Sequence, residues 1–195
     1  MKLTLRGIVF SALFAALLVL FGYISIPLGF SPVPITLQTL AVMLAGALLG
    51  PLYGFLSIAL VVVLTALGFP LMHGAGGLHV LLGATGGYII MWPFSALLIG
   101  WLLSRIRLNG VVSYVAAYAV LLVFGSWLIY VSGIPWLSHV TGLPFAKAMV
   151  QGCYPYLLGD AIKAAAALAV MIPIRQAFPV ERLTGKTGGK VVTLD

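Results

Sequence analysis

One acid–base pair lies inside the last long apolar stretch of the chain. Asp160 and Lys163 are three positions apart, so on a helix both side chains lie on one face, about one turn apart. The residues around them, from Cys153 to Pro173, are almost wholly apolar. Ionisable side chains at membrane depth are costly, usually face the protein interior and mark functional sites. The pair is therefore a candidate binding site; the structural alternative is an ion pair that locks two helices together.

The composition places this pair in a lipid bilayer. Of 195 residues, 63% are hydrophobic and 7% are charged, whereas soluble domains carry about 25% charged residues. The apolar stretches are long and lack the alternation of a β-barrel, so they predict helices. At about 20 residues per span, the length allows about six transmembrane helices, and we expect an all-α integral membrane protein. The tryptophans are mostly candidates for the interfacial belts: Trp92, Trp101, Trp127 and Trp136.

Glycines, prolines and polar clusters divide the apolar sequence into spans. The predicted spans are residues 7–25, 36–50, 53–68, 78–104, 111–131 and 154–174. The connections at 26–34, 69–77 and 133–152 are irregular, and the last has room for a short surface helix. Residues 1–178 form the expected membrane domain, and residues 179–195 a cytoplasmic tail that we expect to be flexible.

Basic residues predict the orientation. With six spans they gather on one side of the membrane, and Lys147 alone falls on the other. Positive residues favour the cytoplasmic side, so both termini are expected in the cytoplasm. Because the net charge of +7 is spread over segment ends, we expect no nucleic acid as a partner. The irregular connections then lie outside, and a cavity that opens outward would have Asp160 and Lys163 on its wall. The basic residues on the cytoplasmic side are Lys2, Arg6, Arg105, Arg107, Arg175, Arg182, Lys186 and Lys190.

Two further segments are candidates for contacts with a small ligand. Three polar residues open the second span and either cap that helix or contact a ligand. A glycine-rich segment within the fourth span allows close backbone approach and ends in an aromatic hydroxyl; its alternative role is close helix packing. The residues concerned are Thr36, Gln38 and Thr39 at the start of the second span, and Thr85, Gly86, Gly87 and Tyr88 in the segment.

The other reactive residues favour neither a metal site nor catalysis. His73 and His79 flank a glycine cluster, but without a nearby Cys, Asp or Glu they make a weak ligand set, so we expect no metal. Cys153 is the one cysteine, so no disulfide framework is expected. An enzyme would have to use Asp160 with a histidine, because no second carboxylate lies at membrane depth. We expect no cofactor.

Ala12 and Ala16 form a pair of small residues four positions apart on the first span. This spacing lets another helix come close. From the spacing alone, packing within the monomer is the favoured interpretation.

Five segments resemble the signatures of the BioY family, whose members are biotin-specific substrate-binding (S) components of energy-coupling factor (ECF) transporters. The resemblance runs in order from about residue 5 to residue 175, and the second and third segments are its most specific part. The segments are residues 24–28 (ISIPL), 31–42 (SPVPITLQTLAV), 82–88 (LGATGGY), 135–137 (PWL) and 159–164 (GDAIKA).

The resemblance implies the six-helix S-component fold and capture of biotin from outside a bacterial or archaeal plasma membrane. It implies two kinds of partner: a transmembrane T component, and two ABC-type ATPases that use ATP. Family members dock on the T component through small alanines of the first helix, so Ala12 and Ala16 become expected docking residues. The alternatives are an S component for another small vitamin, and a small membrane enzyme that uses Asp160.

The chemistry of biotin fits the candidate residues. Its ureido ring offers two N–H donors and one carbonyl acceptor, which a carboxylate and an ammonium complement. We expect Asp160 to accept from a ureido N–H and Lys163 to donate to a biotin oxygen. Tyr88 would cover the thioether ring and the valeryl chain, with Thr36 or Gln38 near the carboxylate. Residues 26–34 are the expected lid.

Overall fold

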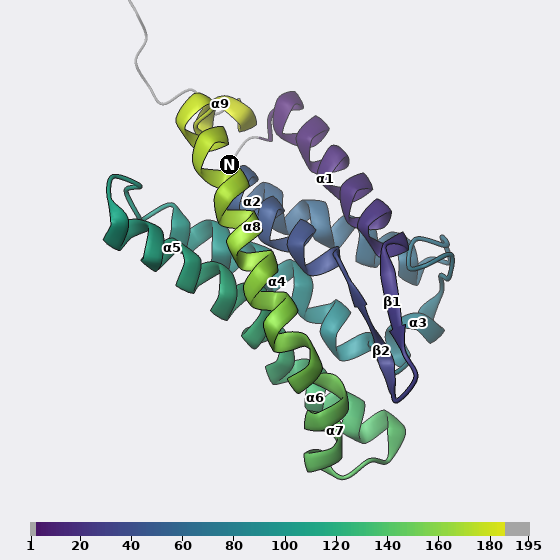
Figure 1. The fold of residues 1–195 in the computed structure, drawn as a ribbon. Helices are drawn as coiled ribbons and strands as arrows, with labels where there is room; N and C mark the ends of the chain where they lie inside the picture. Colours follow the sequence, from purple (N-terminus) through teal and green to yellow (C-terminus); the bar gives the residue numbers. More distant parts are fainter. Residues whose placement is uncertain (1–2, 186–195) are drawn as a thin grey trace, which may run out of the picture.

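The computed structural model describes residues 3–185, which fold into a bundle of helices with one β-hairpin (Figure 1). The elements in chain order are α1 (Leu5–Tyr23), β1 (Ser25–Leu28), β2 (Ser31–Thr36), α2 (Gln38–Ala66), α3 (Leu78–Leu82), α4 (Gly86–Leu103), α5 (Val111–Leu122), η1 (Val123–Trp127), α6 (Leu128–Thr141), α7 (Phe145–Gly152), η2 (Tyr154–Tyr156), α8 (Leu157–Ala177) and α9 (Val180–Thr184). In Figure 1, α1 and the hairpin lie on one side of the bundle and α5 on the other.

Several helical stretches are long and apolar enough to cross a membrane, so the chain is a multi-pass membrane protein. Within the described residues there are five, judged by length and composition. The sequence predicts six spans, and the difference arises in α2, which contains two of the predicted spans. The five stretches are Leu5–Tyr23, Gln38–Ala66, Gly86–Leu103, Val111–Thr141 and Phe145–Ala177.

α2 is broken near its middle, where the sequence predicts a turn. Gly50 has φ +74° and ψ −174°, outside the helical region, and Pro51 follows it. A Cβ placed on Gly54 would lie 3.0 Å from the carbonyl oxygen of Ala45. Residues nine positions apart on a straight helix are separated by about 13.5 Å. The two halves of α2 therefore fold back on each other, and a glycine is required at the positive φ of the turn.

The turn in α2 packs against α4 and α8. A Cβ on Gly100 would lie 2.4 Å from the carbonyl carbon of Gly50. The backbones of α4 and the turn are therefore in direct contact, with no side chain between them. Arg175, in the last turn of α8, donates from Nε to the carbonyl oxygen of Ala47 (2.7 Å) and from Nη1 to that of Leu103 (3.1 Å). Both carbonyls end helical segments, where basic side chains are favourable. One guanidinium thus joins the ends of three helical segments.

The structure corrects two predicted span boundaries. The predicted span 78–104 is interrupted at Gly83, which separates α3 from α4. The fifth predicted span continues through the π-helical turn η1 and α6 to Thr141. The end of α6 and all of α7 therefore occupy most of the predicted connection 133–152. Pro135 favours a loop by sequence, yet it lies inside α6. In apolar surroundings a helix that lacks one hydrogen bond still pairs more of its backbone N–H and C=O groups than an irregular loop does.

The proline-rich connection at 26–34 is not helical, as predicted, and forms most of the hairpin β1–β2. The strands pair antiparallel from Ser25 opposite Thr36. The ladder is irregular at Pro27, which has no N–H to donate. The hairpin carries the chain from the end of α1 back to the start of α2.

The C-terminal segment begins with the short helix α9, within the tail that the sequence analysis expects from residue 179. α9 packs against α1 and α2, and Thr184 is buried. The Thr4 hydroxyl donates to the Thr184 carbonyl, and the Thr4 N–H donates to the Tyr53 hydroxyl (2.9 Å). Residues 186–195 of the predicted tail lie outside the described residues.

Candidate ligand-binding site

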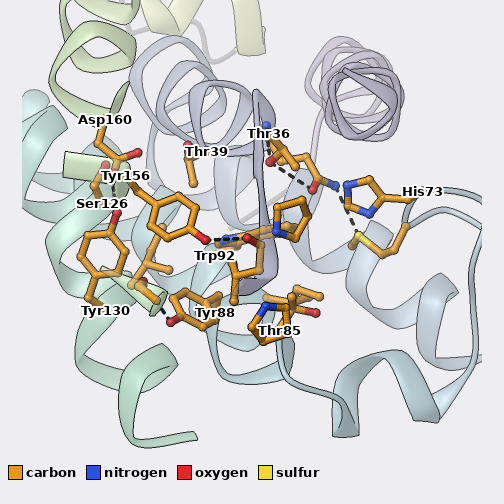
Figure 2. A pocket seen from close by; sticks show the side chains of 18 of the residues that line it. Thr36, Thr39, His73, Thr85, Tyr88, Trp92, Ser126, Tyr130, Tyr156 and Asp160 are labelled. Carbon is orange, nitrogen blue, oxygen red and sulfur yellow. Dashed lines mark hydrogen bonds between the residues drawn. The ribbon is translucent and has the colours of Figure 1, made fainter. Parts of the chain in front are cut away.

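A cavity of about 330 Å³ opens between the hairpin and the helices (Figure 2). Its volume falls in the range of about 300–1,000 Å³ that is typical of small-molecule sites. Most of its wall is apolar or aromatic, with a few polar side chains. It is lined by Pro32, Val33, Pro34, Thr36, Gln38, Thr39, Met72, His73, Ala75, Val80, Thr85, Tyr88, Ile89, Trp92, Ser126, Ile129, Tyr130, Gly152, Tyr156, Asp160 and Lys163.

Asp160 and Lys163 lie together on the cavity wall, as the sequence predicts. Both sit in the first two turns of α8, and their side chains are 3% and 10% exposed. Lys163 Nζ lies 2.9 Å from Asp160 Oδ1 and donates also to Thr39 Oγ1 (2.9 Å). The Tyr130 hydroxyl donates to Asp160 Oδ2. Asp160 lies in the first turn of α8, at the positive end of the helix dipole.

The pair retains unused hydrogen-bonding capacity. A carboxylate has about four acceptor positions and an ammonium three donors. The protein occupies two positions on Asp160 and two donors of Lys163. At least one N–H and further lone pairs are therefore left for a ligand. A group that carries an N–H donor beside a carbonyl acceptor would complement them.

Thr36 and Gln38 both line the cavity, and they also contact each other. Thr36 Oγ1 accepts from the backbone N–H of Gln38 (3.3 Å), the first residue of α2, whose N-cap is Leu37. Gln38 is 1% exposed, and its Nε2 donates to Met72 Sδ at 3.4 Å. A thioether is a weak acceptor, so the Gln38 amide is free to donate instead to a stronger acceptor on a ligand.

The glycine-rich segment is divided between the cavity and the helix interface. Thr85 and Tyr88 line the cavity, and the Tyr88 hydroxyl donates to the carbonyl of Gly152 (3.1 Å). Gly86 and Gly87 do not line it. A Cβ on Gly87 would lie 2.3 Å from Cβ of Trp136, and one on Gly86 would lie 1.8 Å from the Leu81 carbonyl oxygen. Both glycines therefore serve close packing of the helices, which was the alternative to ligand contact.

Four aromatic or hydroxyl residues of the cavity wall were not among the predicted site residues: Trp92, Ser126, Tyr130 and Tyr156. Trp92 was grouped with the interfacial belt, but it is 6% exposed. Its Nε1 and Ser126 Oγ are buried without a hydrogen-bond partner among the described residues. Buried polar atoms are rarely left unpaired, so both are candidates for contact with a ligand. A tryptophan among apolar residues gives no sequence signal of this kind.

The two histidines of the glycine cluster are separated by the structure. His73 lines the cavity, whereas His79 on α3 does not. Partial burial lowers the pKa of His73 below its ordinary value. The absence of a metal site stays a prediction.

Ala12 and Ala16 lie on the exposed face of α1, whereas Ala15 faces the core and is buried. The small residues therefore face away from the bundle. Packing within the monomer, the interpretation from spacing alone, does not describe them.

Comparison with known proteins agrees with this architecture. The BioY family model matches residues 1–180. The biotin transporters BioY of Lactococcus lactis and Rhodobacter capsulatus are 40% and 52% identical over 73 residues, 37% of this chain. The aligned segments span 39% and 38% of those relatives. A solved S-component for biotin from an ECF-type ABC transporter matches with a TM-score of 0.82 and 32% identity, over 88% of this chain and 91% of that one. This chain belongs to the BioY family.

Proposed function

We propose that this protein is the biotin-binding S component of an ECF-type uptake transporter and that it captures biotin from the extracellular side. The observation that carries the proposal is the buried Asp160–Lys163 pair, which lines a cavity and keeps donors and acceptors unused. The match to a solved S-component for biotin supports it. The chain would bind its ligand without chemical change, and ATP would be used by partner subunits.

In the proposed complex the ureido ring meets the acid–base pair. Asp160 accepts from a ureido N–H, and the free donor of Lys163 meets an oxygen. Charge-assisted hydrogen bonds of this kind are roughly twice as strong as neutral ones. Tyr88 and Trp92 supply flat apolar surface for the thioether ring, and Thr36 and Gln38 lie where a carboxylate tail needs donors.

We also propose six spans with both termini in the cytoplasm of a bacterial or archaeal cell. The reversal of α2 at Gly50 supports the division of α2 into two spans. With that division, Arg6, Arg105 and Arg175 fall on one side, as the positive-inside rule requires.

The proposed partners are a transmembrane T component and two ABC-type ATPases. Ala12 and Ala16 are the proposed docking residues. Their exposure on α1 supports this role, because a partner helix can approach small residues closely.

The test is a calorimetric titration of the purified full chain with biotin, beside a panel of other water-soluble vitamins. We expect saturable binding of biotin at micromolar concentration or below, and no heat from the other vitamins. Saturation by another vitamin, with none by biotin, would transfer the proposal to that ligand. Absence of binding throughout would refute it.

A further inference from the structure

A tight turn at the edge of the cavity presents a histidine. Met72 and Ala75 exchange two backbone hydrogen bonds, of 3.0 and 2.8 Å, and close a turn with His73 and Gly74 at its tip. Both tip residues have positive φ, 55° for His73 and 79° for Gly74. Positive φ at both central positions is the signature of a type I′ turn. His73 is thus held in a conformation that histidine tolerates better than most side chains.

The turn is fixed to the rest of the protein. Met72 is 2% exposed, and its sulfur accepts from the Gln38 amide. The Gly77 N–H donates to the Thr65 carbonyl (2.6 Å), which returns the connection to the end of α2. His73 is therefore held in place by contacts of Met72 before it and of Gly77 after it.

His73 lies at the end of the cavity away from the ion pair. Figure 2 shows Asp160 and His73 at opposite ends of the set of lining side chains, with Thr36 between them in this view. His73 lines the cavity and yet remains exposed, so it lies near the opening. The cavity-lining residues of the hairpin, α2, α3 and α4 carry no formal charge; Tyr88 is the titratable one among them. His79 on α3 is the nearby titratable group outside the cavity wall.

We propose that His73, as an imidazolium, binds the carboxylate of the ligand and makes the affinity for carboxylate ligands dependent on pH. The inference rests on the proposed function. If the ureido ring occupies Asp160 and Lys163, the carboxylate tail extends toward the opposite end, where His73 is the group able to carry positive charge. Thr36 and Gln38 then complete its hydrogen bonds.

The direction of the pH effect follows from linkage. In the free protein, partial burial lowers the pKa of His73, and a bound carboxylate favours the protonated imidazole. Biotin's carboxyl, like a glutamate side chain, ionises near about pH 4.3. Both partners are charged between that pH and the pKa of His73 in the complex. Affinity for biotin therefore falls as pH rises through that pKa.

The experiment measures the dissociation constants of biotin and of biotin amide, which has no charge, at about pH 5.5 and about pH 8. The proteins are wild type, His73→Asn and His79→Asn. Asparagine tolerates positive φ, so the turn is preserved, and a thermal unfolding curve checks it. In wild type and His79→Asn, biotin is expected to bind about two- to five-fold more tightly at the lower pH, within the range of a partly exposed ion pair. In His73→Asn the difference in biotin affinity between the two pH values disappears. For biotin amide we expect no difference in affinity between the two pH values with any of the three proteins.

The outcomes separate the two proposals. If folded His73→Asn keeps the pH dependence of biotin binding, or if biotin amide shows the same dependence, the inference is overturned and the proposed function stands. If neither biotin nor its amide binds at either pH, the proposed function fails, and the inference with it.

Discussion

Tyr130 and Asp160 are 30 positions apart in the sequence and meet at the cavity, where the tyrosine hydroxyl donates to the carboxylate oxygen Oδ2. Lys163 donates to the other oxygen, Oδ1. The carboxylate is therefore held from two helices, α6 and α8, before any ligand arrives. Such support fixes the direction of its remaining lone pairs.

Removal of this support tests its contribution to binding. Tyr130→Phe deletes one hydroxyl and keeps the ring, so we expect biotin to bind about tenfold more weakly, in line with about 1.5 kcal/mol for a hydrogen bond to a charged group. The measurement is calorimetry at neutral pH. The matched control is Tyr118→Phe, whose hydroxyl donates to the Ala161 carbonyl (3.3 Å) and lies outside the cavity wall. Equal affinity for both variants would show that Tyr130 does not position the carboxylate.

The ion pair itself is tested with single and double variants. Asp160→Asn leaves the ammonium of Lys163 buried without its counter-charge, and we expect a loss of about 3–5 kcal/mol in stability. Biotin binding should weaken by about 2–5 kcal/mol. Combining Asp160→Asn with Lys163→Met removes both charges and should recover most of the thermal stability.

Binding by that double variant is the decisive measurement. If it is folded and still binds biotin like wild type, the pair is structural, and the ureido contacts proposed for it are wrong.

Close packing of α4 against α6 gives a prediction for stability. Gly87→Ala would place its methyl carbon 2.3 Å from Cβ of Trp136 and 2.8 Å from the Ser132 carbonyl oxygen. Neither neighbour is the free end of a flexible side chain, so we expect a loss of about 1–3 kcal/mol. Gly159→Ala is the control, because no atom lies within 4 Å of its added carbon. It should be neutral or stabilising by up to about 1 kcal/mol. Thermal unfolding in detergent compares them; equal midpoints would contradict the packing.

The exposed face of α1 gives a prediction for assembly. Ala12→Trp places a large ring where the T component is proposed to approach, and it should prevent co-purification while biotin binding is kept. Ala15→Trp, one position from Ala16 but buried, should instead disturb the monomer and reduce biotin binding. Co-purification of Ala12→Trp at the wild-type level would exclude this face as the docking surface.

The ion pair could be located from sequence because an acid and a base are conspicuous in an apolar stretch. Tyr130 could not, since a tyrosine in an apolar helix has no feature that separates a site residue from an interfacial one. The π-helical turn at Val123–Trp127 adds to this difficulty. Such a turn changes the residue repeat locally, so the helical period does not predict which side chains beyond it face the cavity.

The glycines show a second limit to prediction from the sequence. A pair such as Gly86 and Gly87 indicates that something comes close to the backbone, and the sequence does not say what. In the structure the backbone of Leu81 takes the space beside Gly86, and Trp136 takes the space beside Gly87. The Trp136 Nε1 also donates to the Gly83 carbonyl (2.8 Å). By contrast, the break at Gly50–Pro51 is a local property of two residues, and it was predicted correctly.

The hairpin has a consequence for self-association. A two-stranded sheet exposes edges on which strands of other molecules can add. In β2, Pro32 and Pro34 have no N–H, and Val33 between them uses both of its backbone groups: its N–H donates to Ser31 Oγ (3.1 Å), and its carbonyl accepts from the Tyr156 hydroxyl. An incoming strand therefore meets three consecutive residues of β2 without an available amide donor, which makes β2 a poor partner for edge-to-edge pairing.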